Sequence, residues 1–211
     1  MTNTETARHI VLNLLDIGAI KLSLEEPFTW ASGWKSPIYC DNRLALSYPE
    51  IRDYIKYALS SAVKDHFAGT EAIAGVATAG IPQGALVADE LDLPFIYVRS
   101  KPKGHGLTNQ IEGKVVANQK VAVIEDLVST GGSSLKAVEA IRSAGMEVLG
   151  MVSIFTYGFD VSNQNFNQAN VPYLSLSDYD TLIDVGIQND LIPEAQIDRL
   201  KAWRMAPDSW K

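Results

Sequence analysis

The stretch Val121-Ala-Val-Ile-Glu-Asp-Leu-Val-Ser-Thr-Gly-Gly-Ser-Ser134 carries the strongest structural signal in the sequence. Its first four residues are apolar and predict a buried strand, which delivers two adjacent carboxylates, Glu125 and Asp126, to its carboxyl end. A loop of small residues follows, from Ser129 to Ser133, and a helix is expected after it. A strand, a glycine-containing loop and a helix in this order are typical of an α/β domain.

The small-residue loop is predicted to bind a phosphate group. Glycines let backbone N–H groups turn toward a ligand, and the start of a helix favours anions. The two carboxylates beside it suit ribose hydroxyls or a metal ion rather than a second phosphate. The segment is not a Walker loop, because no Gly-Lys-Ser/Thr follows the glycines, and it lacks the Gly-x-Gly-x-x-Gly dinucleotide fingerprint. The alternative is a plain strand–turn–helix junction with acids at a solvated strand end.

Apolar runs on both sides of this segment predict further strands and helices. Alternating strands and helices imply a mostly parallel central sheet flanked by helices. Two more helices are expected before the alternation begins, one around Ile10–Ile17 and one after Pro49, and the polar run Ser162–Asn170 is expected to be a surface turn. The predicted strands are Ala72–Val76, Phe95–Val98, Val121–Ile124 and Val148–Phe155, and the helices between them are Pro82–Leu91 and Ser134–Ala144.

The chain ends lie outside the alternation and are predicted to form a hood. The chain is interpreted as a single domain, 1–211, in which about residues 1–45 and the helical tail Pro193–Met205 cover the sheet edge. Ligands of parallel sheets bind beyond the carboxyl ends of the strands. The segments that follow the strands, 78–80, 99–113 and 125–133, should therefore gather at one edge.

Composition excludes several classes of protein. The chain has 211 residues, 46% hydrophobic and 20% charged, which is ordinary for a folded domain. Cys40 is the only cysteine, so an intrachain disulfide and a thiolate zinc site are both excluded. Neither a signal peptide nor a membrane-spanning run is recognised, and a cytoplasmic location is expected. The net charge of −7 argues against a general binder of nucleic acid or membrane surfaces.

Positive charge is instead gathered in Arg99-Ser-Lys-Pro-Lys-Gly-His-Gly106, directly after the predicted strand Phe95–Val98. Three cations lie within five residues, and His105 titrates near neutrality. Taken alone, a short basic loop is most often a solvated turn. Because it follows the strand before the phosphate loop, we interpret it as a clamp for a diphosphate.

The segment 121–134 resembles the signature with which type I phosphoribosyltransferases bind phosphoribosyl diphosphate (PRPP). The basic loop is similar to the Arg-x-x-x-Lys-x-His-Gly loop of the orotate phosphoribosyltransferases. Two further segments match that family, Phe28-Thr29-x-x-Ser-Gly-x-x-Ser-Pro37 and the turn Gly75-Val-Ala-Thr-Ala-Gly-Ile-Pro82. The resemblance runs from about Phe28 to Phe155, and the combination of motifs is specific.

The resemblance implies the type I phosphoribosyltransferase fold and a Mg²⁺-dependent pentosyltransferase, a glycosyltransferase of pyrimidine (UMP) biosynthesis. Such an enzyme transfers the 5-phosphoribosyl group from PRPP to N1 of orotate, giving orotidine 5′-phosphate and diphosphate. Mg²⁺ would be held mainly by PRPP, with no direct protein ligand. The partners implied are these small molecules and a second subunit, since the family is homodimeric and shares a loop, here 99–113, across the interface.

The same resemblance assigns roles to individual residues. Lys103, His105, Glu125 and Asp126 are the candidate catalytic residues. Tyr39, Arg43 and Ser129 are the candidates for contact with orotate. Those expected to bind PRPP are Arg99, Lys103, His105, Glu125, Asp126, Leu127, Val128, Ser129, Thr130, Gly131, Gly132 and Ser133.

Several positions depart from the family pattern. Many members have lysines where this chain has Ala31, Ala79 and Ser100, and an aspartate in place of Glu125. They also have an arginine near Tyr157 that helps to hold orotate. We hypothesise that Arg43, or backbone N–H groups near residues 32–35, hold the orotate carboxylate instead.

Other readings of the sequence stay open. Trp30 and Trp34 could line the base pocket or form the core of the hood, and Cys40 is expected to have a packing role. A phosphoribosyltransferase for another base, such as a purine, is the nearest rival function. A PRPP-sensing regulator that binds nucleic acid is a rival from another class, but it predicts a basic face that this acidic chain lacks.

Overall fold

The computed structural model describes residues 3–23, 25–30, 33–101 and 110–210. It contains a six-stranded sheet with the order β10-β9-β8-β5-β6-β7, in which only the short edge strand β7 is antiparallel to its neighbour. The four predicted strands are confirmed, and β8 extends past its predicted end. The strands of this sheet are β5 (Ala72–Val76), β6 (Phe95–Val98), β7 (Ile111–Glu112), β8 (Lys120–Val128), β9 (Glu147–Thr156) and β10 (Tyr173–Asp178).

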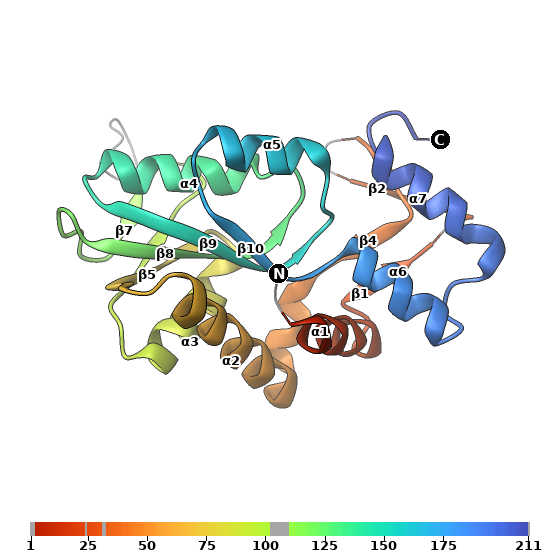
Figure 1. The fold of residues 1–211 in the computed structure, drawn as a ribbon, viewed down its shortest axis with the longest axis horizontal. Helices are drawn as coiled ribbons and strands as arrows, with labels where there is room; N and C mark the ends of the chain where they lie inside the picture. The colour runs from red at the N-terminus through yellow and green to blue at the C-terminus, as the bar shows by residue number, and fades with distance from the viewer. Residues whose placement is uncertain (1–2, 24, 31–32, 102–109, 211) are drawn as a thin grey trace.

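Helices cover both faces of the sheet, as Figure 1 shows. Side chains of β8 alternate between the two faces: Val121 and Val123 belong to the cluster that includes α4, and Ala122 and Ile124 to the cluster that includes α1 and α2. A strand buried on both faces is the expected result of parallel pairing with helical crossovers. The helices are α1 (Thr4–Asp16), α2 (Pro49–His66), α3 (Gly80–Leu91), α4 (Gly132–Ser143), α5 (Asp160–Gln168), α6 (Tyr179–Gln188) and α7 (Ile197–Met205).

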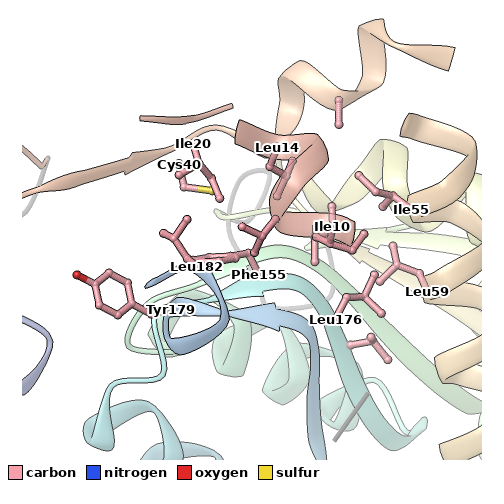
Figure 2. Close-up of a cluster of buried hydrophobic side chains, with 14 of the residues drawn as sticks. Ile10, Leu14, Ile20, Cys40, Ile55, Leu59, Phe155, Leu176, Tyr179 and Leu182 are labelled. Carbon is pink, nitrogen blue, oxygen red and sulfur yellow. The ribbon is translucent and has the colours of Figure 1, made fainter. Parts of the chain in front are cut away.

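The larger core lies between α1, α2 and the sheet (Figure 2). Ile10 and Leu14 of α1 are fully buried and belong to the same cluster as Ile55, Leu59 and Phe155. The helix-period pattern of both segments therefore reflects burial against the sheet. The helix α1 also contacts β10 and α6, so it belongs to the helical layer of the sheet.

Two small antiparallel pairs lie beside the main sheet, at the right of Figure 1. Strand β1 (Ile20–Leu22) pairs with β4 (Ile38–Cys40), and β2 (Phe28–Thr29) pairs with β3 (Lys35–Ser36). The helix α7 packs against them, and the indole Nε1 of its fully buried Trp203 donates a hydrogen bond to the Lys35 carbonyl at 3.0 Å. We call β1–β4 and α7 together the hood. The single-domain assignment stays a prediction.

The prediction of a surface turn at Ser162–Asn170 is wrong. Most of this run forms α5, whose Phe166 is buried against Gly131 of the small-residue loop. The Asn165 side-chain Nδ2 also donates a hydrogen bond to the Thr130 carbonyl at 2.9 Å. The buried residues of α5 are Ser162 and Phe166, so this helix needs few apolar side chains. Its sequence therefore shows almost no helical periodicity of apolar residues. The next two elements, β10 and α6, were not predicted either.

None of the helices in the described ranges is both long and apolar enough to cross a membrane.

The two glycines of the small-residue loop are predicted to respond in opposite ways to alanine. Gly131 has φ +79°, and an added Cβ would lie 2.7 Å from the ring of Phe166. An added Cβ on Gly132 would make an ordinary contact with Thr130 Oγ1 at 3.8 Å, and Gly132 is the first residue of α4. Gly131→Ala should destabilise the protein by about 2–4 kcal/mol through strain and overpacking. Gly132→Ala should be neutral or stabilise it by up to about 1 kcal/mol.

Thermal and urea unfolding of both variants beside the wild type provide the measurement. Equal effects of the two substitutions would contradict the role assigned to the contact between Gly131 and Phe166.

Candidate functional site

The carboxyl ends of β5, β6, β8 and β9 lie at one edge of the sheet because these strands are parallel. The turn after β5 lies very close to β8 there. A Cβ on Gly80 would lie 2.6 Å from the Ile124 carbonyl and 3.4 Å from Glu125 Oε1. Glycine at this position therefore lets the start of α3 approach the strand that carries the two acids.

Glu125 is buried within β8, with 5% of its surface exposed. Its Oε2 accepts a hydrogen bond from the Ser134 hydroxyl at 2.9 Å, and its Oε1 accepts one from the Asp126 backbone N–H at 3.0 Å. Burial raises the pKa of Glu125 well above its usual value, and the neighbouring negative charge of Asp126 raises it further. The carboxyl of Glu125 is thus bonded inside the protein and tied to the first turn of α4.

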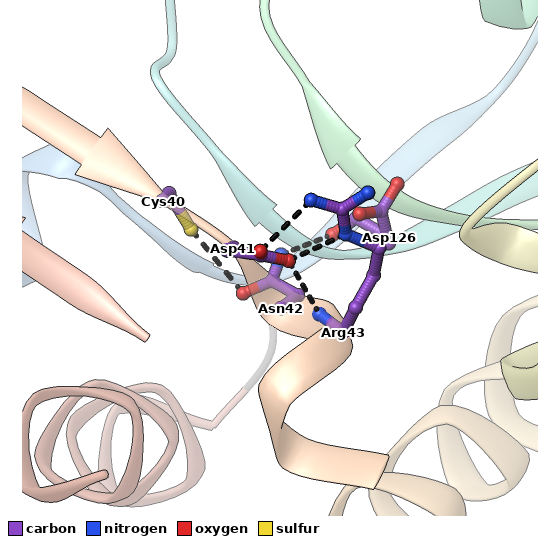
Figure 3. A network of polar contacts seen from close by, with 5 residues as sticks. All are labelled: Cys40, Asp41, Asn42, Arg43 and Asp126. Atoms are coloured by element: carbon purple, nitrogen blue, oxygen red, sulfur yellow. Dashed lines mark hydrogen bonds and ion pairs between the residues drawn. The ribbon is translucent and has the colours of Figure 1, made fainter. Parts of the chain in front are cut away.

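Asp126 is half-buried and lies beside the hood (Figure 3). The side-chain Nδ2 of the buried Asn42 donates a hydrogen bond to the Asp126 carbonyl at 2.8 Å, and the Asn42 Oδ1 accepts one from the Cys40 thiol at 3.2 Å. Burial raises the pKa of Asp126, while the nearby Arg43 charge acts in the opposite direction. The two adjacent acids therefore have different surroundings, one inside the protein and one at its edge.

Arg43 is held by its neighbour Asp41. Its Nε and Nη2 donate to the two carboxylate oxygens of Asp41 at 2.6 and 2.8 Å. This bidentate pair lowers the pKa of Asp41 and raises that of Arg43. Arg43 thus lies near Asp126, but its Nε and Nη2 are both bonded to Asp41. Its predicted contact with orotate stays a prediction.

The small-residue loop leads into α4 as predicted. Gly131 is the N-cap residue in a left-handed conformation, and no side chain caps the first turn of α4. Backbone N–H groups at the start of an uncapped helix attract anions. Of the residues expected to bind PRPP here, Val128 differs from the rest, because its side chain is buried and its carbonyl accepts a hydrogen bond from Thr156 Oγ1.

The basic segment begins on a short antiparallel pairing at the sheet edge. The Arg99 N–H donates to the Gln110 carbonyl at 2.9 Å, next to the paired strands β6 and β7. The Arg99 Nη1 lies 3.6 Å from Glu112 Oε1. Lys103 and His105, two of the predicted catalytic residues, lie outside the described residues.

A cavity of about 260 Å³ opens between the hood and the end of β8, and we call it the base cavity. Tyr39 and Ser129, both predicted to contact a base, line it, and Leu127 of the predicted PRPP set lines it too. Arg43 does not. The remaining lining residues are Thr29, Trp30, Cys40 and Tyr157.

Both open readings of the tryptophans apply to Trp30. It lines the base cavity, and its ring also packs on Tyr157 and Trp203, with centroids 4.9 and 5.7 Å apart. Trp34 lies instead at a neighbouring cavity of about 420 Å³, which includes Thr130 and Arg204. Thr29 and Tyr157 were missed as cavity residues. The sequence offered one signal for Tyr157. It lies near the position at which the family that the chain resembles has an arginine that helps to hold orotate.

Metal ligands do not gather in the described part of the site. Among the residues that the structure describes, no group of three or more His, Cys, Asp or Glu side chains is placed to hold an ion. Cys40 is buried, and burial together with the negative charges of Asp126 and Asp41 raises the pKa of its thiol well above the usual value. Its thiol is therefore a packing and hydrogen-bonding group, as expected.

Comparison with known proteins agrees with this geometry. Residues 47–180 match the family model of the phosphoribosyl transferase domain. The orotate phosphoribosyltransferase of Cytophaga hutchinsonii is 54% identical over 97% of this chain and 98% of its own length. That of Bacteroides fragilis is 57% identical over 94% of this chain and 93% of its own length.

A solved structure supports the same assignment. The crystal structure of the orotate phosphoribosyltransferase from Aeropyrum pernix superimposes with a TM-score of 0.74 at 29% identity, covering 83% of this chain and 96% of the other. The matches to sequence and to structure both span most of the chain, including β8 and the loop that follows it. The chain therefore belongs to the phosphoribosyltransferase family and, within it, to the orotate phosphoribosyltransferases.

Proposed function

We propose that the site described above transfers the 5-phosphoribosyl group of PRPP to N1 of orotate. The products are orotidine 5′-phosphate and diphosphate, and the reaction belongs to pyrimidine biosynthesis. The observation that carries this assignment is the base cavity. It joins hood residues Thr29, Trp30 and Tyr39 to Leu127 and Ser129 at the end of β8, in a chain more than half identical to named orotate phosphoribosyltransferases.

The loop 129–133 is the proposed site for the 5′-phosphate of PRPP. The uncapped first turn of α4 offers backbone N–H groups, and Ser129, Thr130 and Ser133 offer hydroxyls. Phe166 and Asn165 of α5 support the loop from behind. We propose that the ribose lies over Asp126, whose carboxylate is at the protein edge and can accept hydrogen bonds from its hydroxyls.

The two acids contribute differently to the proposed reaction. In a dissociative path, the C1–O bond to diphosphate breaks largely before the C1–N1 bond forms, so positive charge develops on the ribose. The negative field of Asp126 stabilises that charge. Glu125 is bonded to Ser134 and to the Asp126 N–H, so it positions the end of β8 against α4. Orotate itself supplies the attacking nitrogen, and no protein nucleophile is needed.

Mg²⁺ is the proposed cofactor. Asp126 offers one carboxylate near the ribose position, while Glu125 is turned into the protein. This sparse set of donors fits an ion that takes most of its ligands from substrate phosphates and water. When bound, Mg²⁺ would supply charge neutralisation on the diphosphate.

The cations of the segment 99–113 are proposed to act on the leaving diphosphate. Arg99 lies at the start of this segment on the sheet edge, and Lys103 and His105 follow it in sequence. A positive charge close to the departing oxygens stabilises the negative charge that develops there. We propose that this segment completes the site of a second subunit in a homodimer.

Orotate is proposed to lie in the base cavity between Trp30, Tyr39 and Tyr157. Ser129 links this cavity to the phosphate loop, so base and ribose phosphate can be held at the same time. Arg43, which the sequence predicted to hold the carboxylate of the base, does not line this cavity and is paired with Asp41.

The first test is the PRPP- and Mg²⁺-dependent loss of orotate absorbance, with adenine, hypoxanthine and uracil as parallel substrates. We expect turnover of orotate alone. Turnover of a purine instead would keep the phosphoribosyl-transfer mechanism and discard the assignment of the base cavity. PRPP binding without turnover of any of the four bases would favour a PRPP-sensing regulator.

Because Asp126 and Glu125 have different surroundings, replacing each acid by its amide should change kcat to a different extent. Asp126→Asn should lower kcat by roughly a hundredfold, because it removes charge from beside the ribose. Glu125→Gln can still accept from the Asp126 N–H through its carbonyl oxygen and can donate from its amide to Ser134 Oγ, so it should lower kcat much less. Steady-state kinetics with saturating PRPP and orotate measure both. An Asp126→Asn enzyme with unchanged kcat would remove the charge-stabilising role.

Glu125→Gln should also change the pH dependence of stability. The pKa of Glu125 in the folded protein is raised above the ordinary 4.5, so the folded state holds a proton that the unfolded state releases. Stability from this group is present below about pH 4.5 and is lost as the pH rises through the raised pKa. The variant should therefore gain Tm over the wild type at neutral pH and gain little near pH 4, as measured by thermal unfolding without ligands.

A shared site predicts complementation between subunits. Lys103→Ala homodimers and Asp126→Asn homodimers should each be nearly inactive. Mixed dimers, formed by co-expression with two affinity tags, should regain up to about a quarter to a half of wild-type kcat, because one of their two sites combines both intact parts. Mixed dimers no more active than their parents would contradict sharing of the segment 99–113.

A further inference from the structure

The proposed substrate brings a carboxylate into a cavity whose described lining residues include no cation. Its lining consists of aromatic rings, hydroxyls, a thiol and a leucine. A carboxylate moved from water into such surroundings needs hydrogen-bond donors, and a positively charged donor compensates its charge as well. Among the described residues, the cationic side chains of this part of the hood are Arg43, Lys35 and Lys21. Lys21 of β1, which is paired with Tyr39, lies close enough to Asp41 to help lower its pKa.

Arg43 already has a partner. Asp41 accepts two hydrogen bonds from it, and only 18% of the Asp41 side chain is exposed. If Arg43 turned toward the base, Asp41 would lose both bonds and its compensating charge. Such a loss for a partly buried carboxylate costs about as much as the new contact would provide.

Lys35 reaches the wall of the cavity without such a partner. Its Nζ donates a hydrogen bond to Thr29 Oγ1 at 2.7 Å, and Thr29 lines the base cavity. Lys35 and Thr29 are directly paired residues of β3 and β2, so both side chains lie on the same face of the hairpin. Within the described ranges, no carboxylate lies within 4.0 Å of Nζ. A hydroxyl orients the ammonium but leaves its charge uncompensated.

The backbone under Lys35 is fixed although the side chain is exposed. Trp203 Nε1 donates to the Lys35 carbonyl at 3.0 Å from the fully buried side of α7. The Trp30 N–H donates to the Trp34 carbonyl at 2.9 Å, which closes the same hairpin. Trp30 in turn packs on Tyr157 across the cavity wall. The backbone position of Lys35 is therefore fixed by the same contacts that shape the cavity.

We propose that Lys35 is the specificity-determining residue that recognises the carboxylate of the base. This inference rests on the proposed function and specifies how its site selects an anionic pyrimidine. Thr29 holds the ammonium at the cavity wall, and the substrate carboxylate supplies the missing negative charge.

The test compares Lys35→Met with Lys35→Arg, Arg43→Met and the control Lys64→Met, which removes an exposed lysine on α2. Lys35→Met should raise the KM for orotate about ten- to a hundredfold, because a hydrogen bond to a charged group is lost. Its KM for PRPP should stay within about twofold. Lys35→Arg should recover part of the loss, and Lys64→Met should match the wild type.

A neutral analogue separates charge recognition from a structural effect. The methyl ester of orotate is tested as a competitive inhibitor of each variant. Lys35→Met should leave its inhibition constant unchanged within about twofold while it weakens orotate. Equal weakening of acid and ester would show that Lys35 only shapes the hairpin and would overturn the proposal.

The remaining outcomes also decide the question. The inference is refuted if Lys35→Met leaves the KM for orotate unchanged, or if Arg43→Met alone produces the whole rise in that KM. In either case, turnover of orotate by the wild type leaves the proposed function standing. A wild-type chain that does not turn over orotate refutes the proposed function itself, and the inference with it.

Discussion

The pairing of β8 with parallel strands on both sides is the constraint on which the site depends. It places the turn after β5, the acids of β8 and the strand end at Tyr157 along one edge without any long connection. It also buries the middle of β8 completely, so polar groups on the strand must find partners inside the protein. Glu125 does so with Ser134 and the Asp126 N–H, and this joins the strand firmly to α4.

The electrostatics of the site follow from this arrangement. Two adjacent acids beside an anion-binding loop would repel a phosphate if both were exposed and charged. Burial raises the pKa of Glu125 and so reduces its charge, while Asp126 stays at the edge, near Arg43. The negative charge of the site is thereby concentrated on Asp126, beside the proposed position of the ribose. The proposed phosphate loop keeps its uncapped helix start.

Local patterns predicted the parts of the fold that depend on local sequence. The bounds of β5 and β6 match short apolar runs, and the loop after β8 matches its glycines and hydroxyls. The sequence did not reveal α5, because a helix that buries chiefly Phe166 has almost no apolar period. Thr29 and Tyr157 come from distant parts of the chain, and only the packed hood brings them to one cavity. For the same reason, the position of Lys35 beside this cavity could not be predicted from the sequence.

The hydrogen bond between Trp203 and the Lys35 carbonyl spans 168 residues of sequence. Contacts of such separation close a long loop, and their entropic cost is met only after much of the remaining chain is in place. The pairings between strands of the parallel sheet join residues that are closer in sequence, and these strands precede α7 in the chain. We therefore expect the hairpin β2–β3, which this contact joins to α7, to be among the regions that exchange amide protons early when the protein opens locally.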